Sequence, residues 1–220
     1  GNAYVSAAQR YVSGDIGIPS LTAGPSEVLI VADKNSNPEW VASDLIGQAE
    51  HDNLAQCILI SKDKSLLDKV KIEIQKQLKT IPRASVARKS LINNGILIYI
   101  GSDSKIISTT NKIAPEHLEL NVKNYKSIVK SIKNSGSICL GKYAAMALTD
   151  YNVGSNHVLP TNGSSKYSSG ISVNEFYKRI SYINLSKKGI ASLGPAAITL
   201  ANYEGLHAHA QSIIKRIRRK

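Results

Sequence analysis

The stretch "SEVLIVADKNSNPEWVASDLIGQAEHDNLAQCILIS", residues 26–61, decides the fold. It opens and closes on short apolar runs rich in branched residues (26–32 and 55–61), which are typical of buried strands. Between them, polar residues that can cap a helix stand just before Pro38, a residue that suits a first helical turn. Apolar side chains then recur at helical spacing. The stretch therefore predicts a strand, a helix and a second strand.

The same alternation continues along the chain. The predicted elements are an amphipathic helix at 65–78, strands at 95–100, 117–122 and 136–141, and helices at 102–113 and 126–132. Strands and helices that alternate over short connections predict a parallel, Rossmann-like α/β sheet with helices on both faces. Since such sheets bind ligands at the carboxyl ends of their strands, we expect the functional residues there.

The pattern changes after about residue 160. "PTNGSSKYSSGIS" (160–172) is a loop rich in Gly and Ser. We expect a short strand at 179–186 and two helices after it, and place a domain boundary near residue 165. The C-terminal part is thus predicted to be small and mainly helical.

The chain has 220 residues and a net charge of +12, which raises the question of nucleic-acid binding. Most lysines alternate with apolar residues at helical spacing, as on solvated helix faces, and "KRIRRK" at the end is the one dense basic run. With one Phe, one Trp and no RNP-like arrangement of the ten Tyr, stacking platforms are lacking. We therefore expect no nucleic-acid partner.

A few local features predict the cellular compartment of the protein and whether the chain is a fragment. No apolar run is long enough to span a bilayer, so no membrane association is expected. Cys57 and Cys139 stand in apolar, strand-like runs and are predicted to be buried free thiols in a reducing compartment. The opening "GNAYVSAAQRYVSGDIGIP" has no initiator Met or signal peptide and reads as the interior of a longer chain, so we expect a fragment.

Two short motifs carry candidate chemistry in the first part of the chain. In "GQAEHDN", Gln48 and His51 stand three apart and so share one helix face, a weak metal-binding pattern that a surface or C-cap histidine also explains. In "IAPEHLEL", Pro115 ends a helix, and Glu116 and His117 follow directly. This adjacent pair suits acid–base chemistry, although a solvated Glu beside a half-buried His is the alternative.

Three further motifs are candidates. "LTDYNVGSNHVLP" holds Asp150 and His157 among residues that turns also use. Ser26 in "TAGPSEVL" is a candidate site residue only if the other candidate residues lie close to it in the fold. In "YEGLHAHAQ", Glu204 and His209 are five apart, about 140° around a single helix, which predicts different roles for them.

A mixed set of nitrogen and oxygen donors emerges from these motifs. Together, Gln48, His51, Asp150 and His209 would suit zinc or a similar divalent ion. His207 is interpreted as a surface residue. Spacing alone leaves open whether the four donors converge.

Five motifs in this order resemble the histidinol dehydrogenase family: "GPSEVLIVAD", "ASDLIGQAEHD", "APEHLEL", "GSNHVLPT" and "YEGLHAH". The resemblance runs from residue 1 to the end of the chain. Family chains are about twice this length, so the sequence resembles their C-terminal half. An NAD-binding half would then be absent, and the alternative to an enzyme is a non-catalytic, metal-binding dimerisation fragment.

The resemblance implies an oxidoreductase of histidine biosynthesis. It would oxidise L-histidinol to L-histidine through L-histidinal, with two NAD+ and one zinc per site. Transferred by motif, Glu116 and His117 are the catalytic acid–base pair, and Asn2 of "GNAYV" touches the dinucleotide. The implied zinc ligands are Gln48, His51, Asp150 and His209. The implied substrate contacts are Ser26, Gln48, His51, His117, Asp150, His157, Glu204 and His209.

The resemblance also implies a domain plan and a partner. Residues 1–25 would end the NAD-binding domain, 26–165 would form a Rossmann-like zinc and substrate domain, and 166–220 a C-terminal dimerisation arm. The arm would carry Glu204 and His209 into the site of the neighbouring subunit, which gives a homodimer with shared active sites. The expected location is the cytoplasm, and a plastid location stays open because the implied N-terminus is missing.

Overall fold

The structure is a computed structural model that describes residues 3–18, 24–153 and 156–217. It divides into two compact units, Gly1–Phe176 and Tyr177–Lys220.

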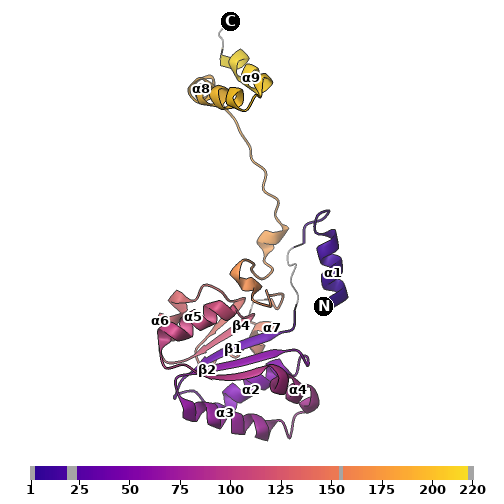
Figure 1. Ribbon diagram of the computed structural model, residues 1–220, viewed down its shortest axis with the longest axis vertical. Coiled ribbons are helices and arrows are strands. Elements are labelled where there is room, and N and C mark those ends of the chain that lie inside the picture. Colours follow the sequence, from indigo (N-terminus) through magenta and orange to yellow (C-terminus); the bar gives the residue numbers. More distant parts are fainter. Residues whose placement is uncertain (1–2, 19–23, 154–155, 218–220) are drawn as a thin grey trace. The chain divides into compact units, whose positions relative to one another are not determined.

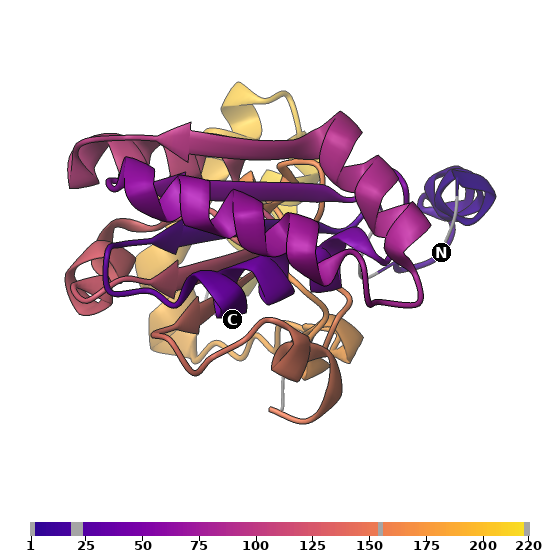
Figure 2. The same cartoon turned by 90° about the horizontal axis from the view of Figure 1, so that it is seen from below.

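A five-stranded parallel sheet forms the centre of the larger unit, as predicted (Figure 2). Its strand order is β3-β2-β1-β4-β5. The strands are β1 (Glu27–Ala32), β2 (Gln56–Ser61), β3 (Gly95–Tyr99), β4 (His117–Asn121) and β5 (Ser137–Leu140).

Helices cover both faces of the sheet, which confirms the predicted α/β class (Figure 1). One face packs on α2 (Pro38–Ala49), α3 (Lys64–Gln77) and α4 (Ala84–Asn94). The other packs on α5 (Asp103–Ile113) and α6 (Tyr125–Ile128). The sequence did not predict α4. Shorter elements of this unit are α1 (Ala3–Val12), α7 (Ala147–Tyr151) and the 3-10 turns η1 (Val129–Ser131), η2 (Ser164–Lys166) and η3 (Val173–Phe176).

Helix α2 is the element that brings polar groups to the site. Its start is fixed by Asn37, whose side chain accepts a hydrogen bond from the backbone N–H of Glu39, and by Pro38 in the first turn. Buried side chains such as Leu45 anchor the helix to the sheet, and each contributes about 1.5–3 kcal/mol on full burial. Because α2 connects two parallel strands, it runs back against them, and its C-terminal end lies at their amino edge.

Strand β4 departs from the apolar pattern of a central strand. Leu118 and Leu120 pack with α5 and α6 in the core. The alternate side chains, His117, Glu119 and Asn121, are also buried and point to the face that carries α2. Buried polar groups are costly without partners, and here Ser137 and Met146 supply partners for two residues of this polar stripe, His117 and Glu119.

One member of the stripe forms a buried acid pair. The side chains of Glu119 and Asp44, from α2, hydrogen-bond each other, and Glu119 Oε1 accepts a 2.7 Å bond from the N–H of Met146. Burial raises the pKa of Glu119 well above its usual value, with the charge of Asp44 adding to it. Burial also raises the pKa of Asp44 to about 6. Two buried carboxyls in hydrogen-bond contact disfavour a double negative charge, so we expect the pair to share a proton.

This pair predicts a stability that depends on pH. Raised folded-state pKa values contribute stability that is complete below the unfolded value of about 4, and that is lost as pH rises through the folded values. Glu119→Gln keeps a permanent N–H donor toward Asp44, so it should be more stable than the wild type at pH 9, by about 1–2 kcal/mol. Urea unfolding at pH 6 and pH 9 measures the difference. Glu39→Gln, an exposed change of the same type, should not alter the pH slope. Equal slopes in the wild type and Glu119→Gln would contradict the shared proton.

The smaller unit is a pair of packed helices, α8 (Lys187–Tyr203) and α9 (His207–Ile217). Ser186 caps α8 by accepting a 3.0 Å bond from the N–H of Gly189. The helices approach closely at Gly194, where an added Cβ would clash with Ile217 and Ile213. The two predicted helices are thus present.

Two predictions for the smaller unit are wrong. Residues 179–186 form no strand, because none of the described residues pairs with them. The stretch 203–211 is not one helix: Gly205, at φ +74°, ends α8, and α9 starts two residues later. The angle of about 140° between Glu204 and His209 therefore does not apply.

The cysteines and the apolar character of the helices bear on two further predictions. Both Cys57 and Cys139 are buried free thiols, as predicted. Within the described ranges, no helix has the length and apolar character required to cross a membrane.

Candidate active site

A pocket of about 280 Å³ opens at the amino edge of the sheet. Its lining residues are Ser26, Gln48, His51, Glu116, His117, Asp150, Tyr151 and His157. All but Tyr151 were singled out from the sequence. Residues more than 100 positions apart in the chain thus meet around one cavity.

The expected place of the site, at the carboxyl ends of the strands, is wrong. Ser26 directly precedes β1, and His117 is the first residue of β4. The usual rule describes ligands held by the loops that follow strands. Here, Gln48 and His51 come from the C-terminal end of α2, which points back to the amino edge.

Backbone hydrogen bonds fix the segment that carries the acid–base pair. Helix α5 ends at Ala114, which takes the left-handed conformation at φ 56°. The Ala114 carbonyl accepts a 2.9 Å bond from Ser165 Oγ, and the Glu116 carbonyl accepts a 2.8 Å bond from the N–H of Ser137. Glu116 and His117 are therefore held at the pocket wall by main-chain contacts on both sides of the pair.

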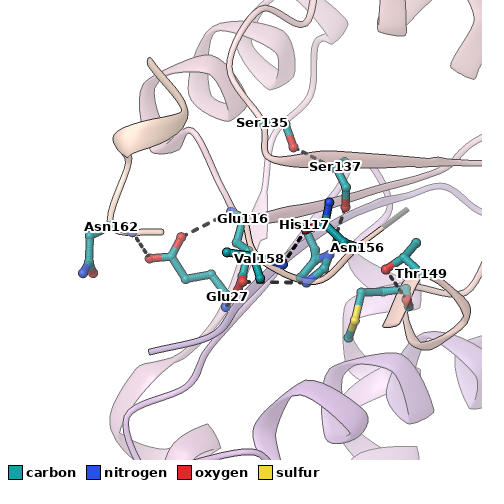
Figure 3. Close-up of polar contacts among 10 residues, drawn as sticks. Glu27, Glu116, His117, Ser135, Ser137, Thr149, Asn156, Val158 and Asn162 are labelled. Carbon is teal, nitrogen blue, oxygen red and sulfur yellow. Dashed lines mark hydrogen bonds and ion pairs between the residues drawn. The ribbon is translucent and has the colours of Figure 1, made fainter. Parts of the chain in front are cut away.

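The Glu116 carboxylate is buried and paired with a second glutamate (Figure 3). Its Oε2 accepts a 2.8 Å bond from the N–H of Glu27. Burial raises the pKa of Glu116 to about 7. The Glu27 N–H opposes this shift, and the charges of Glu27 and Asp150 add to it. Near neutral pH, Glu116 can therefore either accept or donate a proton.

The His117 imidazole is buried beside Glu116 (Figure 3). Its Nδ1 lies 2.9 Å from Ser137 Oγ, and its Nε2 lies 4.0 Å from Glu116 Oε1. Burial lowers the pKa of His117 to about 4, against the charge of Asp150, which raises it. At neutral pH the ring is uncharged, so its contact with Glu116 is no ion pair. A neutral His117 is a competent proton acceptor.

Gln48 shows where a metal could bind. Its side chain is 1% exposed, and among the described residues neither its Oε1 nor its Nε2 has a hydrogen-bond partner. An unsatisfied buried amide is costly, so an additional partner is expected. Gln48, His51 and Asp150 line one pocket and offer oxygen and nitrogen donors of the kind that zinc takes. These three residues fit the implied ion.

The fourth implied ligand belongs to the smaller unit. Within the described ranges, no three His, Cys, Asp or Glu side chains form a group that could hold a metal. The pocket supplies His51, Asp150 and an amide, whereas His209 lies in α9 of the smaller unit. Glu204, the C-cap of α8, belongs to the same unit, and both side chains are exposed. Asn2 lies outside the described residues.

Three residues near the site escaped the sequence analysis. Tyr151 follows Asp150 directly and lines the pocket. Ser137 contacts His117, and Glu27 contacts Glu116. Glu27 did carry a signal, because a carboxylate that opens a buried apolar strand is unusual. Ser137 carried none, since its role depends on pairing between β4 and β5.

Fold and pocket together define a Rossmann-like α/β protein with a buried acid–base pair and potential metal donors at one edge of its sheet. A model of the histidinol dehydrogenase family matches residues 1–217. The chain therefore belongs to the histidinol dehydrogenase family, which confirms the resemblance of its motifs.

Individual relatives agree with this assignment. The chain is 75% identical over 220 residues to a histidinol dehydrogenase of Pelagibacter ubique, covering all of this chain and 51% of the relative. It is 49% identical over 212 residues to that of Nitrosomonas europaea, covering 96% and 49%. The crystal structure of histidinol dehydrogenase from Elizabethkingia anophelis superposes with a TM-score of 0.94 at 38% identity, covering 99% of this chain and 50% of that one. The chain thus spans about half the length of the curated relatives it matches.

Proposed function

We propose that this chain is part of a zinc-dependent histidinol dehydrogenase that oxidises L-histidinol to L-histidine through L-histidinal. The observation that carries the proposal is the convergence of Gln48, His51, Glu116, His117 and Asp150 on one pocket. Family membership supports the reaction class. Each of the two oxidations releases a hydride, which NAD+ accepts, and a proton, which the protein must take up.

His117 takes the proton of the first step. We assign Nδ1–H as the donor to Ser137 Oγ, which leaves Nε2 as the basic nitrogen. Nε2 removes the hydroxyl proton of histidinol as the hydride leaves the carbinol carbon, which gives the aldehyde. The depressed pKa of His117 keeps the ring neutral, and so able to act, across the neutral range.

Glu116 takes the proton of the second step. Its pKa of about 7 leaves an appreciable carboxylate fraction at neutral pH, sufficient to deprotonate a water that attacks the aldehyde carbon. The resulting tetrahedral alkoxide then loses its hydride to the second NAD+, which gives the carboxylic acid of histidine, and the acid ionises by releasing its proton to solvent. Because Glu116 and His117 are adjacent and differ in pKa, one pocket can serve both steps.

Other pocket residues bind and orient. Gln48, His51 and Asp150, with His209, would hold a zinc ion, which when bound would fix the imidazole and amine of the substrate and favour developing negative charge on oxygen. Ser26, His157 and Glu204 would contact the substrate, and Asn2 the dinucleotide. These contacts would hold the substrate and the dinucleotide in the orientation that the reaction requires.

The proposal includes a homodimer with shared sites and a cytoplasmic location. Several large apolar side chains of the smaller unit are exposed, among them Tyr182 (90%), Leu200 and Tyr203 (91%). Exposed apolar surface of this kind marks contact regions in soluble proteins. We propose that a second copy covers these side chains and that His209 and Glu204 serve the pocket of that copy.

A chimera tests this proposal. The N-terminal half of the Pelagibacter ubique relative is joined to this chain, and NADH formation is followed by absorbance. We expect two NADH per histidinol consumed and about one zinc per site. The isolated chain should bind zinc without forming NADH, as the alternative of a non-catalytic fragment also requires. A folded, zinc-loaded chimera that forms no NADH with histidinol would contradict the enzymatic function.

A further inference from the structure

Glu27 has a buried carboxylate that the proposed chemistry does not use. The residue is 8% exposed and opens β1, directly after Ser26 of the pocket lining. Its Oε1 accepts a 2.9 Å bond from the N–H of Asn162, and its Oε2 accepts a 3.4 Å bond from the N–H of Glu116 (Figure 3). The Glu27 N–H in turn donates to Glu116 Oε2 at 2.8 Å.

These contacts connect three segments that are distant in the sequence and that meet at Glu116. Strand register places Glu27 next to Glu116, since Val28 pairs with His117 one residue further on. The bond from Asn162 adds the loop that follows residue 160. The reciprocal bonds between Glu27 and Glu116 fix both the main chain and the carboxylate of Glu116, and an ordinary strand pair would need neither acid.

The pairing is electrostatically unfavourable. Among the described residues, neither Glu27 nor Glu116 forms an ion pair with Lys or Arg. Two carboxylates at close range disfavour each other's ionisation. The structure thus keeps a second acidic residue beside its proton-accepting glutamate, where a residue without a carboxyl would be less costly to bury.

We propose that Glu27 is a positioning residue: its carboxylate, anchored by Asn162, fixes the main chain of Glu116, so that the Glu27 N–H holds the Glu116 carboxylate in place, and its charge acts on the proton that Glu116 takes from water. This inference rests on the proposed function, in which Glu116 serves the second oxidation. The other ionisable residues that line the pocket with Glu116 are His117 on β4, Asp150 and Tyr151 on α7, His51 and His157. Glu27 differs from these five because it contacts Glu116 through paired hydrogen bonds.

The charge can be removed while most contacts are kept. In Glu27→Gln, the amide oxygen can still accept from Asn162, but the negative charge beside Glu116 is lost. Glu116 should then ionise more readily, because the charge of Glu27 raises its pKa. The acidic limb of the pH profile for oxidation of L-histidinal should therefore move to lower pH, by about 0.5–1 unit. Glu39→Gln, exposed and on α2, is the charge-matched control and should leave the limb in place.

A second variant separates position from charge. Glu27→Asp keeps the charge but withdraws the carboxylate, so kcat for L-histidinal should fall about tenfold or more while the KM changes little. Should Glu27→Gln fail to fold, Glu27→Asp carries the test, and wild-type kcat in that variant would overturn the inference. A folded Glu27→Gln with an unmoved acidic limb would overturn it as well.

A readout without turnover distinguishes the two proposals. Carboxyl carbon-13 NMR of the chimera, with the Glu116 signal assigned from Glu116→Gln, should show Glu116 titrating at lower pH in Glu27→Gln than in the wild type. A wild type that forms no NADH would defeat the proposed function but leave this measurement valid. Identical Glu116 titration in both proteins would defeat the role of Glu27 alone.

Discussion

His117→Ala or His117→Asn, in a chain of full family length, should lower histidinol oxidation by about 10²–10⁴-fold while zinc stays near one per site. The reason is the availability of the basic nitrogen: within the described part of the chain, His117 Nε2 forms no hydrogen bond and lies 4.0 Å from Glu116 Oε1, and burial lowers the pKa of the ring so that it is neutral. No other histidine of the pocket shares this buried position, since His51 and His157 are exposed. Steady-state NADH formation and metal analysis of the same samples measure both quantities.

Gln48→Ala is the matched control for this experiment. Its buried amide is expected to bind the metal, so this variant should lose zinc together with activity. The two variants should therefore separate proton transfer from metal binding. Loss of zinc in His117→Ala would make His117 a ligand, and its role as a base would be wrong.

The sheet could be predicted because its signals are local. After Glu27, strand β1 is a run of apolar residues, and α2 has a capping Asn37 before Pro38. Helix α4 could not be predicted, because it buries only Ala87 and Ser90 and so has no distinct apolar face. Its position is set by packing against α2 and β2, which no local pattern encodes.

The sequence indicated most pocket residues one by one, but it did not show that they meet in one pocket. Glu116 and His117 were visible as an adjacent pair after Pro115, whereas their partners Glu27 and Ser137 depend on strand register. Strand register is a tertiary property, so these two partners could not be predicted from the local sequence. The edge of the sheet was misjudged because the usual rule concerns loops after strands, and here the C-terminal end of α2 supplies Gln48.

The C-terminal stretch shows how one backbone feature changes an interpretation. The sequence predicted that Gly205 lies within one continuous helix, but the positive φ of Gly205 ends α8. Glu204 therefore closes one helix, and His209 lies in the first turn of the next. The expectation of different roles for the two residues no longer follows from helix geometry and has to be tested directly.

Mixed dimers provide that test. His51→Ala and His209→Ala, made separately in chains of full family length, should each be nearly inactive, because each homodimer lacks one proposed zinc ligand in both sites. Subunit exchange between them should restore activity. In a hybrid dimer with shared sites, one site carries both defects, while the other combines an intact His51 with an intact His209 from the other chain.

The expected recovery is about half the wild-type activity per hybrid dimer, together with about one zinc per hybrid. Within the smaller unit, His209 is exposed beside large apolar side chains that also face solvent, such as Tyr203. Differently tagged subunits allow the hybrids to be purified and their metal and NADH formation measured. Mixing His51→Ala with Gln48→Ala is the control, since both defects then lie in the same pocket of either chain and one of them remains in each site. Purified His51/His209 hybrids without activity or zinc would show that all the ligands come from one chain, because only a shared site can be rescued by exchange.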